Sequence, residues 1–574
     1  MSAANSFQPN DGVARTAAYS VPRAPTPIDL RLDGNEGMQP PPELLRDLAA
    51  SDPELLRRYP DPKPAEKLLA DRLGISADEI LITAGADDAL DRICRISLGP
   101  GRSLILPEPS FEMLSLYPAI LGAEIESIAW PQGPFPLDGV LAAITPSTGA
   151  IAIVSPNNPT GACATAEDLQ AITKTAPHAL IIIDHAYIEY GGEDLTGLAL
   201  QLPNVVVTRT LSKAYGLAGL RFGYAIARAE VIGWLRAASS PYSVSSPSLS
   251  IACARLLRDD DDVHDHILQI HKERESLLSL LADLGTEPLP SQANFVMTRC
   301  ENSLWLRDGM AGLGIGVRAF PDRDNLDDAV RITCPGNDED FERLRHGLST
   351  TLKPQALLLD MDGVLADVSG SYRRAIVETA AAFDVDLNRE DIQLAKASGS
   401  ANNDWELTHR LIAERGVSAS IEAVTEKFEE LYQGTGERAG LHTTERLLVP
   451  AETLESLASK VTLGVVTGRP RTDMQRFLDD NHLGDVISTT ICMEDAPAKP
   501  DPAGVRLALA RLGVDRAWMI GDTPDDIRAA RNAGVIPIGV IAPGDPAPSV
   551  TDSLFGAGAA RVLENISQIE EFLR

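Results

Sequence analysis

Short runs of apolar residues alternate with helix-like segments between about residues 60 and 350. The runs are ILIT at 80–83, SLIL at 103–106, AIAIV at 150–154, LIIID at 180–184 and NVVVT at 204–208. Nearly continuous apolar character is typical of strands that are buried on both faces. The pattern therefore predicts a parallel sheet covered by helices on both sides. The segment DEDFERLRHGLSTTL at 338–352 predicts a helix that closes this region.

A second sheet is predicted directly after that helix. Only Lys353, Pro354 and Gln355 separate it from the apolar run ALLLD at 356–360, so we expect two domains packed at a fixed angle. Strands return in KVTLGVVT and AWMIGD, and the residues from 371 to about 450 are mostly helical. A helical block inserted between strands of one sheet indicates a cap over a doubly wound core.

The length of 574 residues exceeds what one hydrophobic core holds, so an α/β protein of several domains is expected. The expected parts are a polar, Pro-rich arm at 1–27, a first region at 28–352 and a second region at 355–574. In the first region we expect a large domain at about 60–270 and a small domain formed from both ends. In the second, the core is expected at 355–370 and 450–574, and the cap at about 371–449.

Composition narrows the possible partners. The formal net charge of −31 argues against nucleic acid and anionic membranes, which select basic surfaces. A solvated acidic surface is the ordinary explanation and a halophilic habitat the alternative. The six cysteines form no Cys-x-x-Cys pair, which indicates a reduced, cytoplasmic protein. We find neither a signal peptide nor an apolar run long enough for a membrane span.

The segment RTLSKAYGLAGLRFG at 209–223 contains the first candidate site. Lys213 is flanked by the hydroxyls of Thr210 and Ser212, and Arg221 follows eight residues later. A lone lysine is usually only solvated. A lysine amine beside a phosphate-binding arginine and hydroxyls, however, is what a Schiff base with pyridoxal phosphate requires.

The other parts of such a site occur upstream in order. Asp184 ends the run LIIID, where a carboxylate can pair with a protonated pyridine nitrogen, while Tyr187 and Asn158 offer hydrogen bonds to the ring oxygen. The segment GADDAL at 85–90 would start a helix whose free amides bind phosphate, and Phe111 would stack on the ring. Each residue alone has a structural alternative, such as a helix cap, a turn or a core position. Their joint occurrence favours the cofactor site.

Residues from about 19 to 350 resemble fold-type I aminotransferases, and among these the histidinol-phosphate aminotransferases. The resemblance lies in LDGNEG, RRYPDP, SPNNPTG, DHAYIEY and TLSKAYGLAGLRFG. It implies that Lys213 forms the Schiff base and shuttles the proton, that Asp184 binds the ring nitrogen, and that Asn158 and Tyr187 bind the ring oxygen. The residues implied to hold the cofactor phosphate are Ala86, Asp87, Thr210, Ser212, Arg221 and, from the partner subunit of a homodimer, Tyr59.

The same resemblance bears on the substrate. Arg318 and Arg331 match two arginines that hold the anionic end, which is a phosphate or the carboxylate of glutamate or 2-oxoglutarate. Two arginines suit a doubly charged group, although binding of an amino-acid carboxylate by Arg331 remains an alternative. Tyr19 and Asn35 stand at further substrate-binding positions. The chain departs from the family in His185, where glutamate is usual, and in lacking a proline after the NE of LDGNEG.

The run ALLLD leads into a second candidate site, in which Asp360 and Asp362 are two residues apart. At the carboxyl edge of a sheet, one carboxylate can attack phosphorus while the other protonates the leaving oxygen and then activates water. Later features support this chemistry: in VVTGRP at 465–470 an apolar strand ends in Thr467, Lys499 supplies a cation, and Asp522 and Asp526 can hold Mg²⁺.

These motifs resemble the haloacid-dehalogenase-like phosphatases with a helical cap, over about 355–574. The resemblance implies that Asp360 is the nucleophile and Asp362 the acid/base. It also implies that Asp360, Asp522 and the Asp362 carbonyl bind Mg²⁺ with support from Asp526, and that Thr467 and Lys499 bind phosphate. A haloalkanoate dehalogenase is disfavoured by Asp362 and the acidic turn, while a non-catalytic regulatory domain remains an alternative.

The roles of two further parts of the second region are left open by the sequence. Arg469 either helps to bind phosphate or has a surface role. The cap segment SGSANNDWELTHR at 398–410 is a candidate specificity element through Asn402, Asn403, Asp404 and Trp405.

The two predicted activities are consecutive in histidine biosynthesis. Transamination of imidazole-acetol phosphate gives histidinol phosphate, and dephosphorylation of that gives histidinol. A fusion of the two regions therefore indicates a bifunctional histidine enzyme, by analogy. The alternative is an enzyme of specialised metabolism that acts on another phosphorylated or amino-acid metabolite.

Overall fold

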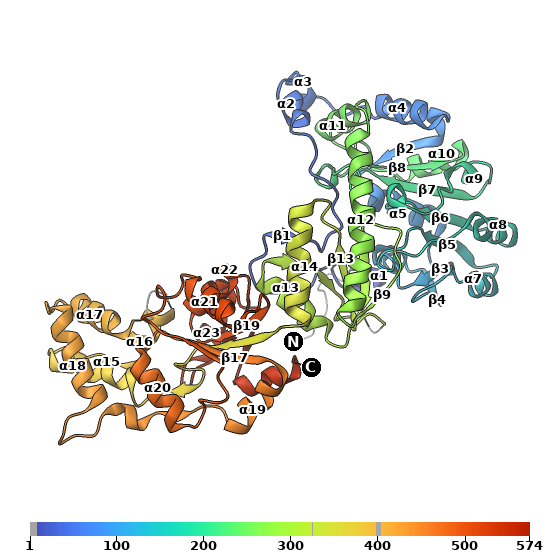
Figure 1. Cartoon of the computed structure of the whole chain (residues 1–574). Helices are drawn as coiled ribbons and strands as arrows, with labels where there is room; N and C mark the ends of the chain where they lie inside the picture. Colours follow the sequence, from blue (N-terminus) through green and yellow to red (C-terminus); the bar gives the residue numbers. More distant parts are fainter. Residues whose placement is uncertain (1–8, 324, 398–402, 574) are drawn as a thin grey trace, which may run out of the picture. The chain divides into compact units, whose positions relative to one another are not determined.

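The computed structural model describes residues 9–323, 325–397 and 403–573 (Figure 1). Tertiary contacts divide the chain into two compact units. The first comprises the residues up to 22 together with 32–301 and 318–341, and the second comprises 23–31, 302–317 and 342–574. Within the described ranges, no helix is both long enough and apolar enough to cross a membrane.

A seven-stranded sheet forms the centre of the first unit. Its order is β2 (Ile80–Thr83), β8 (Gly223–Ala227), β7 (Val205–Thr210), β6 (Leu180–Asp184), β5 (Thr148–Val154), β3 (Ser103–Glu108) and β4 (Glu124–Ala129). The five predicted strands are confirmed. The sheet is parallel from β7 through β6, β5 and β3 to β4, and it is mixed because β8 runs antiparallel to both β2 and β7. The chain returns there directly after the loop that contains Lys213.

Alternate residues of the central strands enter different hydrophobic clusters. In β6, Ile181 and Ile183 belong to one cluster while Ile182 belongs to another. In β7, Val205 and Val207 are separated from Val206 in the same way. Because side chains alternate across a strand, both faces of the sheet are buried, which explains the continuous apolar runs.

The first unit also contains helices, several of which pack on this sheet, and a smaller sheet (Figure 1). The helices are α1 (Asp11–Ala14), α2 (Glu43–Ala49), α3 (Glu54–Arg57), α4 (Lys63–Leu73), α5 (Gly85–Ser97), α6 (Met113–Ile120), α7 (Leu137–Ala143), α8 (Ala166–Thr175), α9 (Thr196–Ala199), α10 (Ala229–Ala237), α11 (Ser246–Leu256) and α12 (Asp261–Asp283). The smaller sheet has the order β12 (Arg318–Ala319), β13 (Ala329–Thr333), β10 (Phe295–Arg299) and β9 (Glu287–Pro288).

A six-stranded, wholly parallel sheet forms the core of the second unit. Its order is β18 (Thr489–Ile491), β17 (Thr462–Val466), β14 (Ala356–Leu359), β19 (Ala517–Gly521), β20 (Ile536–Val540) and β21 (Arg561–Leu563). From β14 the chain first builds outward on one side, to β17 and β18, and then crosses to β19 on the other side. This reversal at β14 is the place where ligands bind in open α/β sheets.

The helical insertion lies between β14 and β17. It contains α15 (Tyr372–Ala382), α16 (Arg389–Ala397), α17 (Asp404–Glu414) and α18 (Ile421–Gln433). The chain enters it through β15 (Ala366–Asp367) and leaves through β16 (Arg446–Leu447), and these two strands pair with each other. The remaining helices of the core are α19 (Ala451–Lys460), α20 (Arg471–Asp480), α21 (Ala503–Leu512), α22 (Pro524–Asn532) and α23 (Ala547–Ala557).

Segments that precede the junction at 353–355 also belong to the second unit. They are β1 (Leu30–Arg31), α13 (Ser303–Gly312), β11 (Ile315–Gly316) and most of α14 (Asp338–Leu352). Trp305 is buried, with its ring 4.7 Å from that of Trp518 and 4.8 Å from that of Phe572. The Trp518 Nε1–H donates to the Thr350 carbonyl at 2.7 Å. One hydrophobic core therefore includes residues from both sides of the junction.

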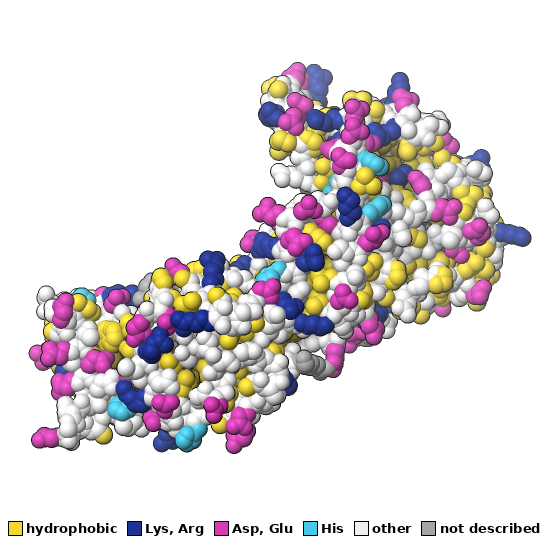
Figure 2. All heavy atoms as spheres, in the orientation of Figure 1, with side chains coloured by type: hydrophobic (Ala, Val, Ile, Leu, Met, Phe, Trp, Pro, Cys, Tyr) yellow, Lys and Arg dark blue, Asp and Glu magenta, His cyan; other side chains and the backbone are white. Residues whose placement is uncertain are grey.

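Charged side chains of both signs are exposed on the surface (Figure 2). On the face shown in Figure 2, acidic and basic side chains are interspersed among polar and apolar ones. Such mixing is typical of a solvated surface.

Replacing Trp305 by Ala should destabilise the second unit by about 3–5 kcal/mol, the usual cost of removing a buried aromatic side chain. Hydrogen exchange followed by mass spectrometry should then show faster exchange of the β14 and β19 amides. Trp234→Ala is the control, because Trp234 is 52% exposed and belongs to the first unit. Unchanged exchange in both strands of the Trp305 variant would contradict the shared core.

Candidate active sites

The pairing of β2, β8 and β7 brings residues of the first site together at one edge of the seven-stranded sheet. Gly223 of β8 pairs with Thr83 of β2 on one side and with Thr210 of β7 on the other. Helix α5 begins two residues after Thr83, so its first amides lie next to Thr210. A Cβ atom on Gly223 would lie 2.5 Å from the carbonyl carbon of Gly85, and this close approach requires glycine.

The residues predicted to bind the cofactor phosphate meet at this place. Thr210 donates its hydroxyl to the Ser212 oxygen at 2.8 Å, and Arg221 donates to the Asp87 carboxylate at 2.7 Å. Arg221 has a left-handed backbone (φ 51°), and its guanidinium lies against Gly85, where a Cβ would be 2.7 Å away. Helix amides, two hydroxyls and an arginine thus form a cradle of hydrogen-bond donors suited to a phosphate.

Asp184 and Lys213 lie near this cradle. Asp184 is buried at the end of β6 and accepts hydrogen bonds from Thr208 Oγ1 at 3.0 Å and from the Ala186 amide at 3.2 Å. Burial raises the pKa of Asp184 to about 6, and the positive charge of Lys213 opposes this rise. The Lys213 Nζ donates to the Gly34 carbonyl at 3.0 Å and lies 5.4 Å from the centre of the Tyr187 ring.

Hydrogen bonds connect the remaining predicted residues. Asn35 Nδ2 donates to the Tyr187 hydroxyl at 3.0 Å, and Asn35 Oδ1 accepts from Thr333 at 2.9 Å. Arg331 Nη1 donates to Asn158 Oδ1 at 2.5 Å. The segment LDGNEG, the loop after β5 and strand β13 are thereby held together around Tyr187 and Asn158.

Arg318 and Arg331 form a cross-strand pair. They stand directly opposite each other in the register of β12 and β13, where two like charges are unfavourable without a counter-ion. Both side chains are buried, and Arg318 Nη1 and Arg331 Nε have no hydrogen-bond partner in the part of the chain that the structure describes. The pair therefore offers unused donors and positive charge to an anion.

Two residues beside this pair, Glu112 and Arg323, were not predicted from the sequence. Glu112 accepts from Arg318 at 3.3 Å and from Arg323 at 3.4 Å. The only sequence signal was that Glu112 follows Phe111 directly.

Tyr19 is 55% exposed; partial burial and the charge of Glu112 raise its pKa, while Arg318 and Arg331 lower it. Tyr19 thus lies within electrostatic range of the arginine pair.

Two further predicted cofactor-binding residues, Phe111 and Tyr59, differ in burial: Phe111 is half-buried and Tyr59 is exposed. Phe111 is half-buried against the hydrophobic cluster that contains Leu106, Leu114 and Val154. Tyr59 is 79% exposed and stacks on Tyr242, with ring centres 4.4 Å apart.

His185 is fully buried beside Asp184. Its Nδ1 lies 2.6 Å from the Ser155 carbonyl, and its Nε2 accepts from the Leu195 amide at 3.1 Å. Burial lowers the pKa of His185 to about 4, so the ring is neutral at pH 7 and Nδ1–H is the donor. At this position, where glutamate is usual in the resembled family, the histidine joins the loop after β5 to β6.

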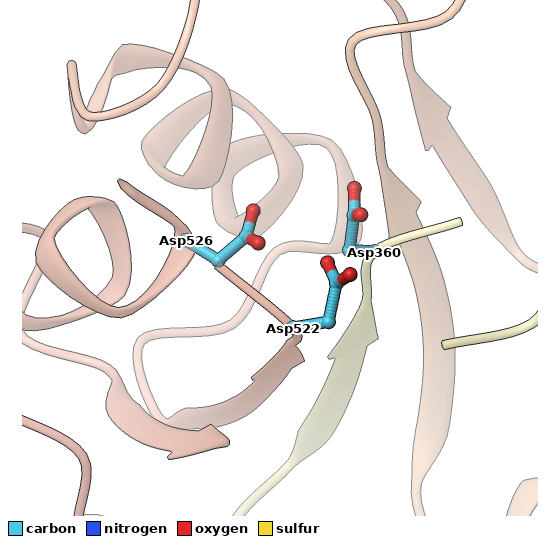
Figure 3. A group of neighbouring side chains, drawn as sticks. All are labelled: Asp360, Asp522 and Asp526. Atoms are coloured by element: carbon cyan, nitrogen blue, oxygen red, sulfur yellow. The ribbon is translucent and has the colours of Figure 1, made fainter. Parts of the chain in front are cut away.

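The second site lies at the carboxyl ends of β14, β17 and β19. Leu359 pairs with Val465 on one side and Ile520 on the other, so Asp360, Thr467 and Asp522 emerge at the same edge. Asp526 joins them from the first turn of α22. Oxygen atoms of Asp360, Asp522 and Asp526 all lie within 4.8 Å of one another (Figure 3).

Lys499 lies buried between two of these carboxylates. Its Nζ is 2.6 Å from Asp360 Oδ1 and 2.5 Å from Asp526 Oδ1, and it also donates to the Val466 carbonyl at 3.1 Å. Burial raises the pKa of Asp360 to about 7; Lys499 opposes this rise, whereas Asp526 and Asp362 add to it. Burial alone would lower the pKa of Lys499, but Asp360 and Asp526 raise it above its ordinary value.

Asp362 and Arg469 form a separate ion pair. Arg469 Nε donates to Asp362 Oδ1 at 2.6 Å, and the Arg469 amide donates to the buried Thr467 hydroxyl at 3.1 Å. Arg469 is only 2% exposed, so the alternative of a surface role for it is wrong. The sequence signal was its position two residues after Thr467, but burial could not be read from that.

The candidate specificity residues of the cap make contacts inside the cap. Asn403 caps α17 by accepting from the Trp405 and Glu406 amides, and Trp405 Nε1 donates to Glu429 at 3.0 Å. Asn402 lies outside the described residues.

The sequence matches two family models. The model for aminotransferase class I and II matches residues 29–348. The chain belongs to this family. The model for haloacid dehalogenase-like hydrolase matches residues 354–534, so this aminotransferase also carries a hydrolase domain and is an enzyme of both kinds. The expected combination of fold-type I aminotransferase and hydrolase core is confirmed.

Three proteins illustrate what this aminotransferase resembles. It is 32% identical over 326 residues to histidinol-phosphate aminotransferase of a Thermoanaerobacter species, covering 54% of this chain and 91% of that protein. The solved structure of histidinol-phosphate aminotransferase from Sinorhizobium meliloti with pyridoxal-5'-phosphate is 25% identical with a TM-score of 0.55, covering 61% of this chain and 99% of that one. An imidazoleglycerol-phosphate dehydratase of Phytophthora nicotianae is 47% identical over 220 residues. That match covers 37% of this chain and 48% of the relative, so the chain spans about half of that protein.

Replacing Lys499 by Met should abolish hydrolase activity and lower the free energy of unfolding by about 3–5 kcal/mol, because it leaves buried carboxylates without their cation. Chemical unfolding and phosphate release are the measurements. Lys427→Met is the matched control, since Lys427 contacts only Glu430 on the cap surface among the residues described. A stable and active Lys499 variant would contradict the role of the buried cation.

Proposed function

We propose that the enzyme converts imidazole-acetol phosphate and glutamate into histidinol phosphate and 2-oxoglutarate, and then hydrolyses histidinol phosphate to histidinol. The opposed pair Arg318 and Arg331 carries this proposal. Its unused donors fit a doubly charged phosphate, and the same chain contains a carboxylate site suited to removing one.

Pyridoxal phosphate fits the first site. Gly223 and Gly85 leave room for the phosphate cradle, and Asp184 is a buried carboxylate to which a protonated ring nitrogen would supply the missing countercharge. When bound, the cofactor supplies an electron sink for the bonds at the substrate's amino-bearing carbon. The residues that would hold it are Ala86, Asp87, Phe111, Asn158, Asp184, Tyr187, Thr210, Ser212 and Arg221.

Lys213 would perform the proton transfer of the first reaction. Its amine would hold the cofactor covalently and, when free, would move a proton at the substrate carbon. Arg318 and Arg331 would hold the phosphate of the keto substrate, and the side-chain carboxylate of glutamate in the other half-reaction. Tyr19 and Asn35 would complete this site, and Glu112 would give up its contact with Arg318 when the anion binds.

Magnesium fits the second site. Asp360, Asp522 and Asp526 bring three negative charges together and Lys499 supplies only one positive charge, so a divalent cation would balance the group. A Cβ on Gly363 would collide with the Asp522 carboxylate, which places the Asp362–Gly363 backbone next to the proposed ligands. Bound Mg²⁺ would neutralise charge on the phosphoryl group.

The protein side chains would carry out the hydrolysis. Asp360 would attack phosphorus while Asp362 donates a proton to the ester oxygen that leaves. Asp362 would then accept a proton from the water that releases phosphate from Asp360. Thr467 and Lys499, which border Asp360, would bind the phosphoryl oxygens.

The relatives support the choice of substrate. Two of the three similar proteins named above are histidinol-phosphate aminotransferases by name. The third is named a dehydratase of imidazoleglycerol phosphate. Loss of water from that compound gives the imidazole keto phosphate that we propose as the first substrate.

A purified holoenzyme given glutamate and imidazole-acetol phosphate should release histidinol and inorganic phosphate. Asp360→Asn should stop at histidinol phosphate, because it removes the phosphorus nucleophile of the second site and leaves the first site unchanged. Lys213→Ala should form no histidinol phosphate and should lack the visible absorbance of the lysine-linked cofactor. Chromatography of the products and spectra of the proteins measure both effects.

Each outcome tests a separate part of this proposal. Absence of turnover by the unmodified enzyme would exclude the proposed substrate. Phosphate release by the Asp360 variant would contradict the nucleophile, and a persistent absorbance band in the Lys213 variant would contradict the lysine.

A second copy of the chain would complete the first site. Large apolar side chains of Leu45, Leu56, Tyr59 and Tyr242 are exposed on the first unit, and Tyr59 borders a cavity of about 360 Å³ together with residues of α3 and α11. Exposed apolar groups of this kind favour association. In the proposed homodimer, Tyr59 reaches the cofactor phosphate of the partner subunit.

Co-expressing Lys213→Ala with Tyr59→Ala tests this arrangement. If Tyr59 acts across the dimer, mixed dimers contain one site with both Lys213 and Tyr59, and about a quarter of all sites should be intact. Transaminase activity at limiting pyridoxal phosphate should then exceed that of either variant alone. Activity equal to the average of the two variants would show that Tyr59 acts in its own chain.

A further inference from the structure

Arg469 connects the proposed acid/base of the hydrolase site to the cap. Its guanidinium donates from Nε to Asp362 at 2.6 Å and from Nη1 to Glu445 Oε2 at 2.8 Å. The side chain is 1% exposed and lies over the rings of Tyr372 at 4.9 Å and Phe477 at 5.6 Å. One buried cation is thus fixed by two carboxylates and two aromatic rings.

Glu445 lies where the chain passes from the cap back to the core. It directly precedes β16, and its Oε1 accepts hydrogen bonds from Ser371 Oγ at 2.8 Å and from the Tyr432 hydroxyl at 3.0 Å. Ser371 directly precedes α15, the first helix of the cap, and Tyr432 belongs to α18. Glu445 therefore joins the entry and the exit of the cap to Arg469.

We propose that Arg469 is a positioning residue that orients Asp362 for proton transfer to the leaving oxygen, and that Glu445 ties this orientation to the cap. The inference rests on the proposed acid/base role of Asp362. An aspartate side chain has several rotamers, and the bond from Arg469 Nε to Asp362 selects one of them. Arg469 itself is held by Glu445 and by the rings of Tyr372 and Phe477, so this orientation is fixed before substrate arrives.

The affected step is the first phosphoryl transfer. An Asp360 oxygen forms a bond to phosphorus while the bond from phosphorus to the ester oxygen breaks. The electron pair of that bond goes to the ester oxygen, which takes the proton of Asp362. In the second step water attacks phosphorus, Asp362 takes back a proton, and inorganic phosphate leaves Asp360.

Two aryl phosphates of similar shape separate acid catalysis from phosphate binding. Phenolate is a poor leaving group that needs a proton, whereas the nitro group makes p-nitrophenolate a good one. The ratio kcat/KM reports only the steps up to loss of the phenol, so the later attack of water does not affect it. Variants are therefore compared by kcat/KM on phenyl phosphate and p-nitrophenyl phosphate with Mg²⁺ present.

Arg469→Ala should lower kcat/KM on phenyl phosphate about 100-fold, but on p-nitrophenyl phosphate by less than about 10-fold, because general acids contribute chiefly when the leaving group is basic. Arg469→Lys should recover part of the loss, and Glu445→Gln should show the same substrate dependence with a smaller effect. Arg471→Ala is the matched control, since Arg471 is an exposed neighbour paired with Asp495; both substrates should be unaffected.

A double-mutant comparison tests whether Arg469 acts through Asp362. In a protein that already carries Asp362→Asn, adding Arg469→Ala should cost little further activity on phenyl phosphate. Equal losses on both substrates, or an additive loss in the double variant, would overturn the proposal and assign Arg469 to phosphate binding or to folding. If Arg469→Ala does not fold, Arg469→Lys and Glu445→Gln give the same test.

The two proposals fail in different ways. Hydrolysis of aryl phosphates without hydrolysis of histidinol phosphate would exclude the proposed substrate and leave the role of Arg469 standing. Absence of hydrolysis of any of the three compounds by the unmodified enzyme would overturn both.

Discussion

Hydrogen bonding between parallel strands determines which side chains meet in this enzyme. Leu359 pairs with Val465 and Ile520, and this register alone brings Asp360, Thr467 and Asp522 to one edge. In the first unit, the pairing of Asp184 with Thr208 similarly aligns β6 with β7, two residues before Thr210. A slip of one residue would turn each of these side chains to the opposite face. The apolar runs that bury both faces of the sheets therefore also determine which reactive side chains meet where the strands end.

Both sites keep like charges close together before a ligand arrives. Arg318 and Arg331 oppose each other in the first site, and Asp360, Asp522 and Asp526 converge in the second. Burying such groups opposes folding, and the surrounding core must offset that cost. In return, an anion at the first site or a divalent cation at the second meets charges that are already gathered in one place. The partial countercharges Glu112 and Lys499 reduce the repulsion without removing it.

Strands and motif residues could be predicted from the sequence because each has a local signal. The five predicted strands of the first sheet are apolar throughout, as burial on two faces requires. Strand β4 is partly exposed along its whole length and lacks that signal, whereas β8 is buried throughout but its antiparallel direction has no signal in the apolar pattern. Glu112 and Arg323 could not be predicted, because their contact with Arg318 depends on how loops distant in sequence fold together. The position of Arg469 was visible, but its burial depends on the rings of Tyr372 and Phe477.

The packing of Trp305 against Trp518 and Phe572 has a consequence for how such a fused gene can change. Recombination that exchanged only the coding sequence after residue 353 would combine a foreign hydrolase with the original α13 and α14. These two helices contact Trp518 through Trp305 and Thr350. To be stable, the incoming part would have to match Trp305 and Thr350 and supply a cation for Asp308, which pairs with Arg561 at 2.6 Å. Inheritance of the hydrolase is thereby linked to short segments of the aminotransferase, and the two halves are constrained to evolve together.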